Sequence, residues 1–257
     1  MAVVTELFLG ERVDLDLWLV VAAALWGAAA GLLVPRPAYR LAVEPDEPWR
    51  DRRPDGQPIT GVARGWLGLA RSPGGSWYGP GTLLVSPATA LVCAGLALAT
   101  GTRPELGAWL LLAPLGVLLA VVDFRVQRLP DALTLPLAVA ALALLGVAAA
   151  LPEHAGDWLT ALFGALALGG AYFVLFLINP NGMGFGDVKL ALGLGAVLGW
   201  YGWSVVFLGT FAGFLFGALY GMVLVIVRRA GRKTSIPFGP FLIAGAYVGL
   251  LIGAYAA

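Results

Sequence analysis

The stretch VKLALGLGAVLGWYGWSVVFLGTFAGFLFGALYGMVLVIV, residues 188–227, decides the fold class of this chain. It contains one charged residue, Lys189, and a helix needs about 20 apolar residues to cross a hydrocarbon layer about 30 Å thick. The stretch is too long for one ordinary span, and Trp200, Tyr201 and Trp203 stand near its middle around Gly202. Because tryptophan and tyrosine favour the membrane–water interface, we predict a tight reversal there, with a span on each side.

The composition of the whole chain agrees with this interpretation. Of 257 residues, 60% are hydrophobic and 12% are charged, with a mean hydropathy of +0.86, whereas soluble domains carry about 25% charged residues. The alternation of a membrane β-barrel is absent, and a backbone in lipid must satisfy its own hydrogen bonds. We therefore expect an all-α polytopic membrane protein with about eight transmembrane helices. The predicted spans are 17–35, 82–100, 106–123, 132–151, 157–179, 187–200, 203–228 and 237–256.

The distribution of lysine and arginine predicts the orientation, because basic residues favour the cytoplasmic side. With the N-terminus outside, the inside loops are 36–81, 124–131, 180–189 and 228–236. These loops hold 14 of the 16 basic residues: Arg36, Arg40, Arg50, Arg52, Arg53, Arg64, Arg71, Arg125, Arg128, Lys189, Arg228, Arg229, Arg232 and Lys233.

We expect residues 1–81 to form an N-terminal span with a cytoplasmic loop, and residues 82–257 to form a second unit.

Other features of the chain bound its function. Its net charge of +1 gives no reason to expect nucleic acid, and its single cysteine, Cys93, cannot form an internal disulfide. The N-terminus lacks the basic segment of a secretory signal peptide, so we expect the first span to be retained. The loop 36–81 is rich in proline, glycine and arginine and has no helical period. We interpret it as a solvated loop, with reception of a basic substrate segment as the alternative.

Three acidic residues stand at the ends of predicted spans on the same side. Asp123 ends the third span, Asp131 opens the fourth and Asp187 opens the sixth. Ionisable groups at the edge of hydrocarbon are costly and are candidates for function. The simpler alternatives are an N-cap for Asp131 and Asp187, and an ion pair of Asp123 with Arg125 or Arg128.

Two of these carboxyls could form an acid–base pair. Two carboxyls in a poorly solvated pocket cannot both ionise cheaply, so one keeps a proton. Such a pair can activate water with one member and protonate a carbonyl oxygen with the other, as in aspartic proteases. Gly184 and Gly186 beside Asp187 would allow close backbone approach and unusual dihedral angles.

Three segments carry a resemblance to a known family. They are DFRVQRLPDALTLP at 123–136, GMGFGDVKL at 182–190 and SIPFGPFL at 235–242. Their order and spacing resemble those of the type IV prepilin peptidases, which are intramembrane aspartyl proteases with a G-x-G-D motif.

The resemblance implies an aspartic-type endopeptidase with Asp123 and Asp187 as the catalytic residues and no metal or cofactor for peptide cleavage. It implies that prepilins or pilin-like precursors are cut after the glycine that ends a basic leader and immediately before a hydrophobic helix, at the cytoplasmic face of the inner or plasma membrane. The motif residues with supporting roles would be Pro130, Asp131, Gly184, Gly186, Lys189, Pro237, Gly239 and Pro240. Lys189 would orient substrate or bias the protonation of the pair, or else only anchor the interface.

The N-terminal third departs from the family pattern. The segment GLLVPRP at 31–37 is a degraded form of the family's G-S-F-x-N-V-x-x-x-R-x-P stretch, and the two C-x-x-C pairs that bind zinc are missing. We therefore expect no zinc. The departure also argues against the N-methyltransferase activity of the larger members, which uses S-adenosylmethionine.

Other functions compete with the peptidase interpretation. A presenilin-like protease also uses G-x-G-D but needs a Y-D and a P-A-L motif, which the chain lacks. A proton-coupled transporter would use membrane carboxylates as relays, and a structural subunit of a secretion machine would hold inert aspartates. The sequence does not determine the oligomeric state.

Overall fold

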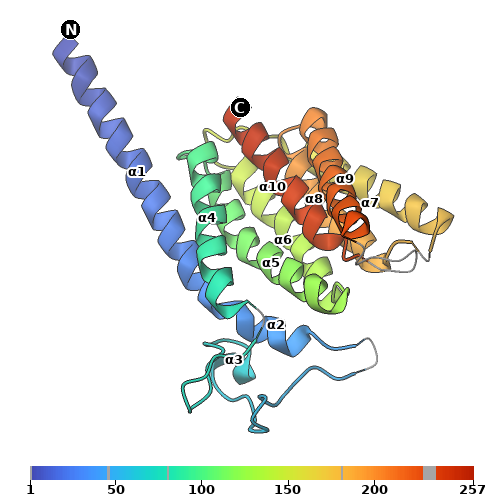
Figure 1. Cartoon of the computed structure of the whole chain (residues 1–257). Helices are drawn as coiled ribbons and strands as arrows, with labels where there is room; N and C mark the ends of the chain where they lie inside the picture. The colour runs from blue at the N-terminus through green and yellow to red at the C-terminus, as the bar shows by residue number, and fades with distance from the viewer. Residues whose placement is uncertain (1, 45–46, 80, 181, 228–235) are drawn as a thin grey trace.

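The computed structural model describes residues 2–44, 47–79, 81–180, 182–227 and 236–257 (Figure 1). Within these ranges the chain is helical, and its only strand pairing consists of the isolated bridges Arg52–Pro58 and Arg71–Trp77. The helices are α1 (Ala2–Leu33), α2 (Pro35–Leu41), α3 (Val62–Gly65), α4 (Thr82–Thr100), α5 (Glu105–Val126), α6 (Asp131–Ala149), α7 (Trp158–Ile178), α8 (Phe185–Gly199), α9 (Trp203–Ile226) and α10 (Gly239–Ala256).

The expected polytopic membrane fold is confirmed. Seven helical segments in the described part of the chain are long and apolar enough to cross a membrane. The predicted span 187–200 is not among them: it corresponds to α8, which has 15 residues and is about 22 Å long at 1.5 Å per residue. Most of α8 is buried among other helices of the bundle, so its length does not have to match the thickness of the hydrocarbon layer. The predicted reversal follows α8, where Gly202 has a φ of +96° and begins the turn into α9.

Glycine allows the closest helix contacts in the bundle. A Cβ on Gly164 of α7 would lie 2.5 Å from the backbone oxygen of Gly195 on α8. A Cβ on Gly245 of α10 would lie 2.3 Å from the backbone nitrogen of Gly213 on α9. Small residues let helices in lipid approach until their backbones touch, which compensates for the weak hydrophobic drive to associate there. These contacts pair α7 with α8 and α9 with α10.

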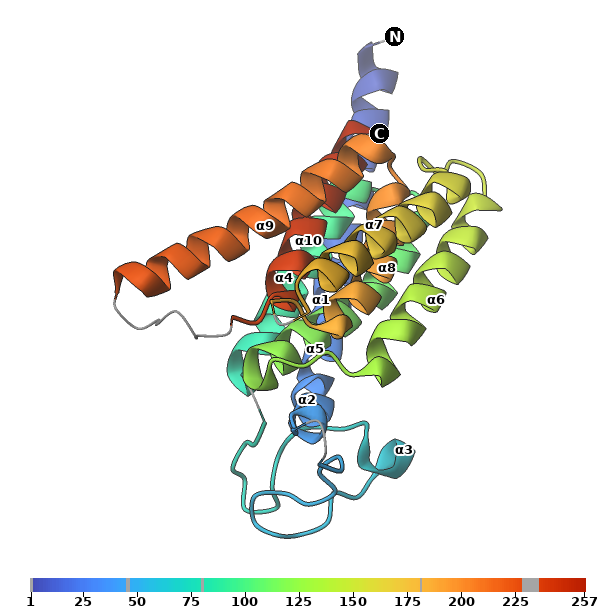
Figure 2. The same ribbon diagram turned by 90° about the vertical axis from the view of Figure 1, so that its right-hand side faces the viewer.

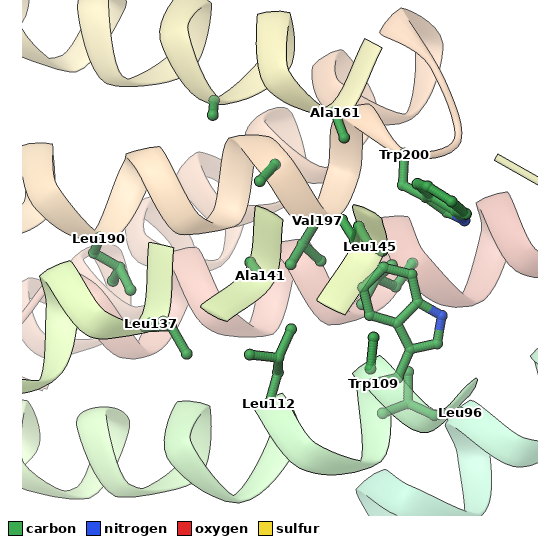
Figure 3. Close-up of a cluster of buried hydrophobic side chains, with 14 of the residues drawn as sticks. Leu96, Trp109, Leu112, Leu137, Ala141, Leu145, Ala161, Leu190, Val197 and Trp200 are labelled. Atoms are coloured by element: carbon green, nitrogen blue, oxygen red, sulfur yellow. The ribbon is translucent and has the colours of Figure 1, made fainter. Parts of the chain in front are cut away.

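The buried core lies among α4, α5, α6, α7, α8 and α10, and Figure 3 shows part of it. Trp109 and Trp200 are the largest fully buried side chains. In Figure 3, Leu112 of α5 and Leu137 of α6 extend from their helices into the space between them. The core therefore joins the helices that carry the three candidate aspartates.

The N-terminal helix α1 packs along α4 and projects beyond the bundle (Figures 1 and 2). It begins at Ala2, well before the predicted start at residue 17, because apolarity marks only the part of a helix that lipid covers and not where the helix begins.

The segment after α2 is more ordered than the predicted solvated loop. Arg36 is buried, and its guanidinium donates to the carbonyl oxygens of Thr60 and Leu67, the latter at 3.0 Å. Arg40 donates to the carbonyl oxygens of Arg50 and Arg64, at 3.0 and 3.1 Å. Arginine can do this because its guanidinium presents five donors in a fixed fork. Backbone carbonyls and guanidinium groups therefore hold this segment together.

Two turns in this segment have the same hydrogen-bond pattern, 19 residues apart. The Gly56 N–H donates to the Arg53 carbonyl at 2.9 Å, and the Gly75 N–H donates to the Ser72 carbonyl at 2.9 Å. In each turn the first residue also donates its N–H to a carbonyl four residues later, at 2.8 Å. The segment lies at the end of the bundle where α5 ends and α6 begins, and Arg128 joins them by donating to the Glu44 carbonyl at 3.0 Å (Figure 1).

Some residues that the sequence analysis used lie outside the described part of the chain. Arg228, Arg229, Arg232 and Lys233, which contributed to the expected orientation, lie outside the described residues. The same holds for Ser235, the first residue of the third motif.

Candidate active site

Asp123 is buried in the last turn of α5, with 4% of its surface exposed. Its Oδ2 accepts a hydrogen bond from the backbone N–H of Gly239 at 3.0 Å. Gly239 is the first residue of α10, and the first N–H groups of a helix have no partner within that helix. The partial positive charge of a helix N-terminus stabilises a nearby carboxylate. The start of α10 therefore holds the Asp123 carboxyl in place.

Asp187 is buried in the first turn of α8, with 7% of its surface exposed. Its backbone N–H donates to the carbonyl oxygen of Gly184 at 3.0 Å, which closes the turn. Its carboxyl interacts electrostatically with Asp123. Among the residues that the structure describes, no hydrogen bond joins the two carboxyls directly.

Leu129 packs between the turn that carries Asp187 and the start of α10, which binds Asp123. A Cβ on Gly186 would lie 2.8 Å from the Leu129 Cβ, and a Cβ on Gly239 would lie 3.3 Å from the Leu129 Cδ1. The Asp187 turn and the start of α10 therefore both approach the same buried side chain. Because α5, α8 and α10 all contribute, the pair is formed by segments far apart in the sequence.

This arrangement suits acid–base chemistry on a polar bond. Both carboxyls are nearly inaccessible to solvent, and they lie at one end of the bundle, which we call the aspartate end. Two carboxyls so placed can share one proton, with one acting as acid and the other as base. The role of Asp123 and Asp187 as a catalytic pair stays a prediction that this geometry supports.

Asp131 has a different environment. It is the first residue of α6, 64% of its side chain is exposed, and its carboxylate forms an ion pair with the Lys189 ammonium at 2.6 Å. The N-cap residue of α6 is Pro130 and that of α8 is Gly184, so the N-cap alternative is wrong for both aspartates. The alternative ion pair of Asp123 with Arg125 or Arg128 is also wrong, because the ion pair found among the described residues joins Lys189 to Asp131.

Lys189 connects two of the sequence motifs. Its ammonium contacts Asp131 and lies 4.9 Å from the centre of the Phe185 ring. It thereby links the start of α6 to the start of α8, which carries Asp187. Its observed contacts are structural, and a direct role toward substrate stays a prediction.

The glycines beside Asp187 have ordinary backbone dihedral angles, and what matters at Gly186 is the absence of a side chain. Gly184 has an ordinary φ of −73°, and Gly186 is not among the described residues with positive φ. The expectation of unusual dihedrals is therefore wrong for both, whereas the expected close approach holds for Gly186, where a side chain would meet Leu129.

The motif prolines mark helix starts at the aspartate end. Pro130 is buried, and its carbonyl accepts from the Thr134 hydroxyl at 3.3 Å in the first turn of α6. Pro237 is buried just before α10, and Pro240 is buried in its first turn. Proline suits the first turn of a helix because its missing N–H would have no partner there.

Tyr172 is a residue near the pair that the sequence motifs did not indicate. It is fully buried on α7, its hydroxyl has no hydrogen-bond partner, and it interacts electrostatically with Asp187. Its ring stacks on Phe214, which contacts Phe238 beside Gly239. The sequence did offer one signal, because Tyr172 lies inside the predicted span 157–179. A buried tyrosine hydroxyl usually has a hydrogen-bond partner, so such a residue is a candidate for a polar site.

Glu105 is a buried acid at the opposite end of α5 that the sequence placed in an outside loop. It is fully buried, and its Oε1 accepts from the Ala155 N–H at 3.3 Å and from the Tyr201 hydroxyl at 3.4 Å. Burial raises the pKa of the Tyr201 phenol, and the nearby Glu105 charge acts in the same direction. The structure therefore holds an acidic residue in its core away from the aspartate pair.

The described residues contain no group of three or more His, Cys, Asp or Glu side chains that could hold a metal ion. The absence of zinc from this protein stays a prediction.

The chain is similar in sequence to known proteins. The model of the type IV leader peptidase family matches residues 110–222. The prepilin leader peptidase/N-methyltransferase of Escherichia coli K12 is 33% identical over 180 residues, which cover 68% of this chain and 75% of that protein. The chain belongs to the type IV leader peptidase family.

Other members of the family are similar over a shorter part of their length. The Pseudomonas aeruginosa protein of the same name is 36% identical over 173 residues, or 66% of this chain and 58% of that protein. The Burkholderia pseudomallei protein is 34% identical over 201 residues, or 74% of this chain and 59% of that protein. The chain thus spans somewhat more than half the length of these two relatives. No solved structure gives a significant match.

The matched family segment contains both buried aspartates and Asp131 but not Gly239. The contact of Asp123 with the start of α10 is therefore a feature that the tertiary structure adds to the family match.

Proposed function

We propose that this chain is a membrane-embedded aspartic endopeptidase that removes the basic leader of type IV prepilins or pilin-like precursors, cutting after a glycine at the cytoplasmic membrane face. The observation that carries the proposal is the pair of buried carboxyls, Asp123 and Asp187, which separate helices bring to the aspartate end. Membership of the type IV leader peptidase family agrees with it.

The chemistry follows from one shared proton. The ionised carboxyl takes a proton from water, whose oxygen attacks the carbonyl carbon of the scissile amide, while the protonated carboxyl gives its proton to the carbonyl oxygen. Collapse of the tetrahedral intermediate breaks the C–N bond, and the leaving amine takes up a proton from the pair. The Gly239 N–H keeps one oxygen of Asp123 oriented throughout. Either aspartate can take either role.

The position of the pair suits a substrate that is cut at the membrane edge. Asp123 stands in the last turn of α5 and Asp187 in the first turn of α8, so both lie next to connecting segments. The basic loop 36–81 lies at the same end, and lysine and arginine favour the cytoplasmic side. We therefore assign the aspartate end to the cytoplasmic face of the inner or plasma membrane, and the peptidase unit to residues 82–257.

The test is cleavage of a purified precursor in detergent by wild-type protein and by three Asp→Asn variants. Asp123→Asn and Asp187→Asn are expected to abolish cleavage and to leave membrane insertion and the unfolding temperature unchanged. Asp131→Asn is the control, because its exposed carboxylate contacts Lys189 and not the pair. Retained turnover in either of the first two variants would rule out the two-carboxyl mechanism. Complete loss in Asp131→Asn would show that the wrong partner was chosen.

We further propose that cleavage needs no metal or cofactor and that the new N-terminus is not methylated. The cysteine pairs of the larger members are missing, and residues 31–37 depart from their pattern. A chelator is expected to leave the cleavage rate unchanged. Mass spectrometry of the product with S-adenosylmethionine present is expected to show an unmodified N-terminus, and an added methyl group would contradict this part of the proposal.

A further inference from the structure

An apolar groove runs along one face of α5 between that helix and α10. Its volume is about 390 Å³, within the range of ligand-binding pockets in proteins. The α5 wall repeats every three or four residues, at Trp109, Leu112, Ala113, Gly116, Val117, Ala120, Val121 and Phe124, and residues of α4, α6, α8 and α10 complete the groove. Many of these side chains are only half-buried, so the groove opens on the outside of the bundle.

The floor of the groove has the pattern of a helix-docking surface. Gly116 and Ala120 are four residues apart on α5, and Ala244 stands opposite on α10. Small residues at this spacing let a second helix approach closely in lipid. Among the described residues, a Cβ on Gly116 would meet only the Ile243 Cγ2 of α10, at 3.6 Å, so the described part of the chain leaves room beside Gly116.

One end of the groove lies next to the chain segments that hold Asp123, although neither aspartate lines it. At one end it is lined by Phe124, the chain neighbour of Asp123, and by Pro240, the chain neighbour of Gly239. At the other end it reaches Trp109, which is 14 residues from Asp123 on α5 and thus about 21 Å away at 1.5 Å per residue. A helix lying along the groove would place its end beside the segment that carries Asp123 and could run along α5 for about 14 residues.

We propose that this groove binds the apolar helix that follows the scissile bond of the precursor, with the helix N-terminus at Asp123. This inference rests on the proposed function, because a precursor cut just before an apolar segment has the required order: cleavage site first, membrane helix second. The apolar lining matches such a helix, and the small residues on the floor admit its backbone. The groove thereby sets where along the precursor the carboxyls act.

A kinetic test uses a substitution that fills the groove and leaves Asp123 and Asp187 unchanged. Gly116→Leu is expected to raise KM for the full-length precursor by about tenfold, which corresponds to about 1.4 kcal/mol of lost binding. The wild-type preference for full-length precursor over one truncated soon after the cleavage site is expected to shrink in the same variant. Gly107→Leu is the matched control on the same helix, because a Cβ there meets nothing within 4 Å and the groove lining excludes it. Equal KM values for the two variants would overturn the proposal.

A cross-linking test separates the groove from the proteolysis. Cys93 is the only cysteine, so a Cys93→Ala background allows Val117→Cys to form a disulfide, under added oxidant, with a cysteine in the apolar segment of the precursor. If the Val117→Cys variant forms the disulfide but the wild-type protein cleaves no precursor, the groove binds the helix and the proposed function is refuted. Cleavage without a disulfide would refute the groove, leaving lipid as its occupant, and disulfide-linked copies of the enzyme alone would assign it to a second copy.

Discussion

Replacement of Gly239 by alanine tests how the structure holds Asp123. The added Cβ would lie 2.9 Å from the Asp123 Oδ2 and 3.3 Å from the Leu129 Cδ1. Because carbon and oxygen atoms without a bond do not approach this closely, the carboxyl must move or give up its hydrogen bond from the Gly239 N–H, which is 3.0 Å long. The backbone N–H itself is unchanged by the substitution, so only the geometry is perturbed.

The expected size of the effect follows from the energy of that hydrogen bond. A hydrogen bond to a charged group contributes about 1.5–3 kcal/mol, and each 1.36 kcal/mol corresponds to a tenfold change in rate. Full loss of the contact in the transition state would therefore lower kcat by about 10- to 150-fold. KM is expected to change little, because Gly239 does not line the groove proposed to bind the precursor helix.

The assay is the initial rate of precursor cleavage by purified protein in detergent, measured over a range of precursor concentrations. Gly107→Ala is the control, since a Cβ at that position meets nothing within 4 Å. The unfolding temperature of each variant must be measured, so that a loss of folded protein is not mistaken for a loss of catalysis. If Gly239→Ala keeps a kcat within about twofold of the wild type, the start of α10 does not position the carboxyl and the reasoning fails.

Three further predictions concern the surroundings of the pair and the helix packing. The first is a double-mutant cycle of Asp131→Asn and Lys189→Ala, in which the free energy of unfolding of each variant gives the interaction energy between the two side chains. This energy is expected to be below about 1 kcal/mol, because the carboxylate is largely exposed. A larger value would mean that the link between α6 and α8 is a main stabilising contact. Gly164→Ala is expected to lower the unfolding temperature, since its Cβ would collide with the α8 backbone, whereas Gly170→Ala on the same helix meets nothing within 4 Å and should have little effect; equal unfolding temperatures would contradict the close contact. Tyr172→Phe removes a buried hydroxyl without a hydrogen-bond partner and should not lower the unfolding temperature; a clear drop in a thermal melt would reveal a partner.

Several features of this protein could be predicted from local sequence because the local physics is strong. The length of the apolar runs predicted the helices, and the tryptophans and tyrosine at 200–203 predicted the break between α8 and α9. Hydropathy could not show that α8 is short and enclosed, because the sequence of an apolar helix has the same high hydropathy whether lipid or protein surrounds the helix. Charge spacing likewise could not show that arginines organise the segment after α2, since their partners are backbone carbonyls.

The sequence by itself determined the membrane fold and singled out Asp123, Asp131 and Asp187 as the acids worth testing, because a charge beside hydrocarbon is costly and stands out in an apolar pattern. Only the tertiary structure decided how their surroundings differ: Asp123 and Asp187 are buried and interact, while Asp131 is exposed and bound to Lys189. It also decided that Glu105 is buried and that Gly239 donates to Asp123. The physical reason is that burial and hydrogen bonding depend on which helices meet, and the contact between α5 and α10 joins residues 116 positions apart.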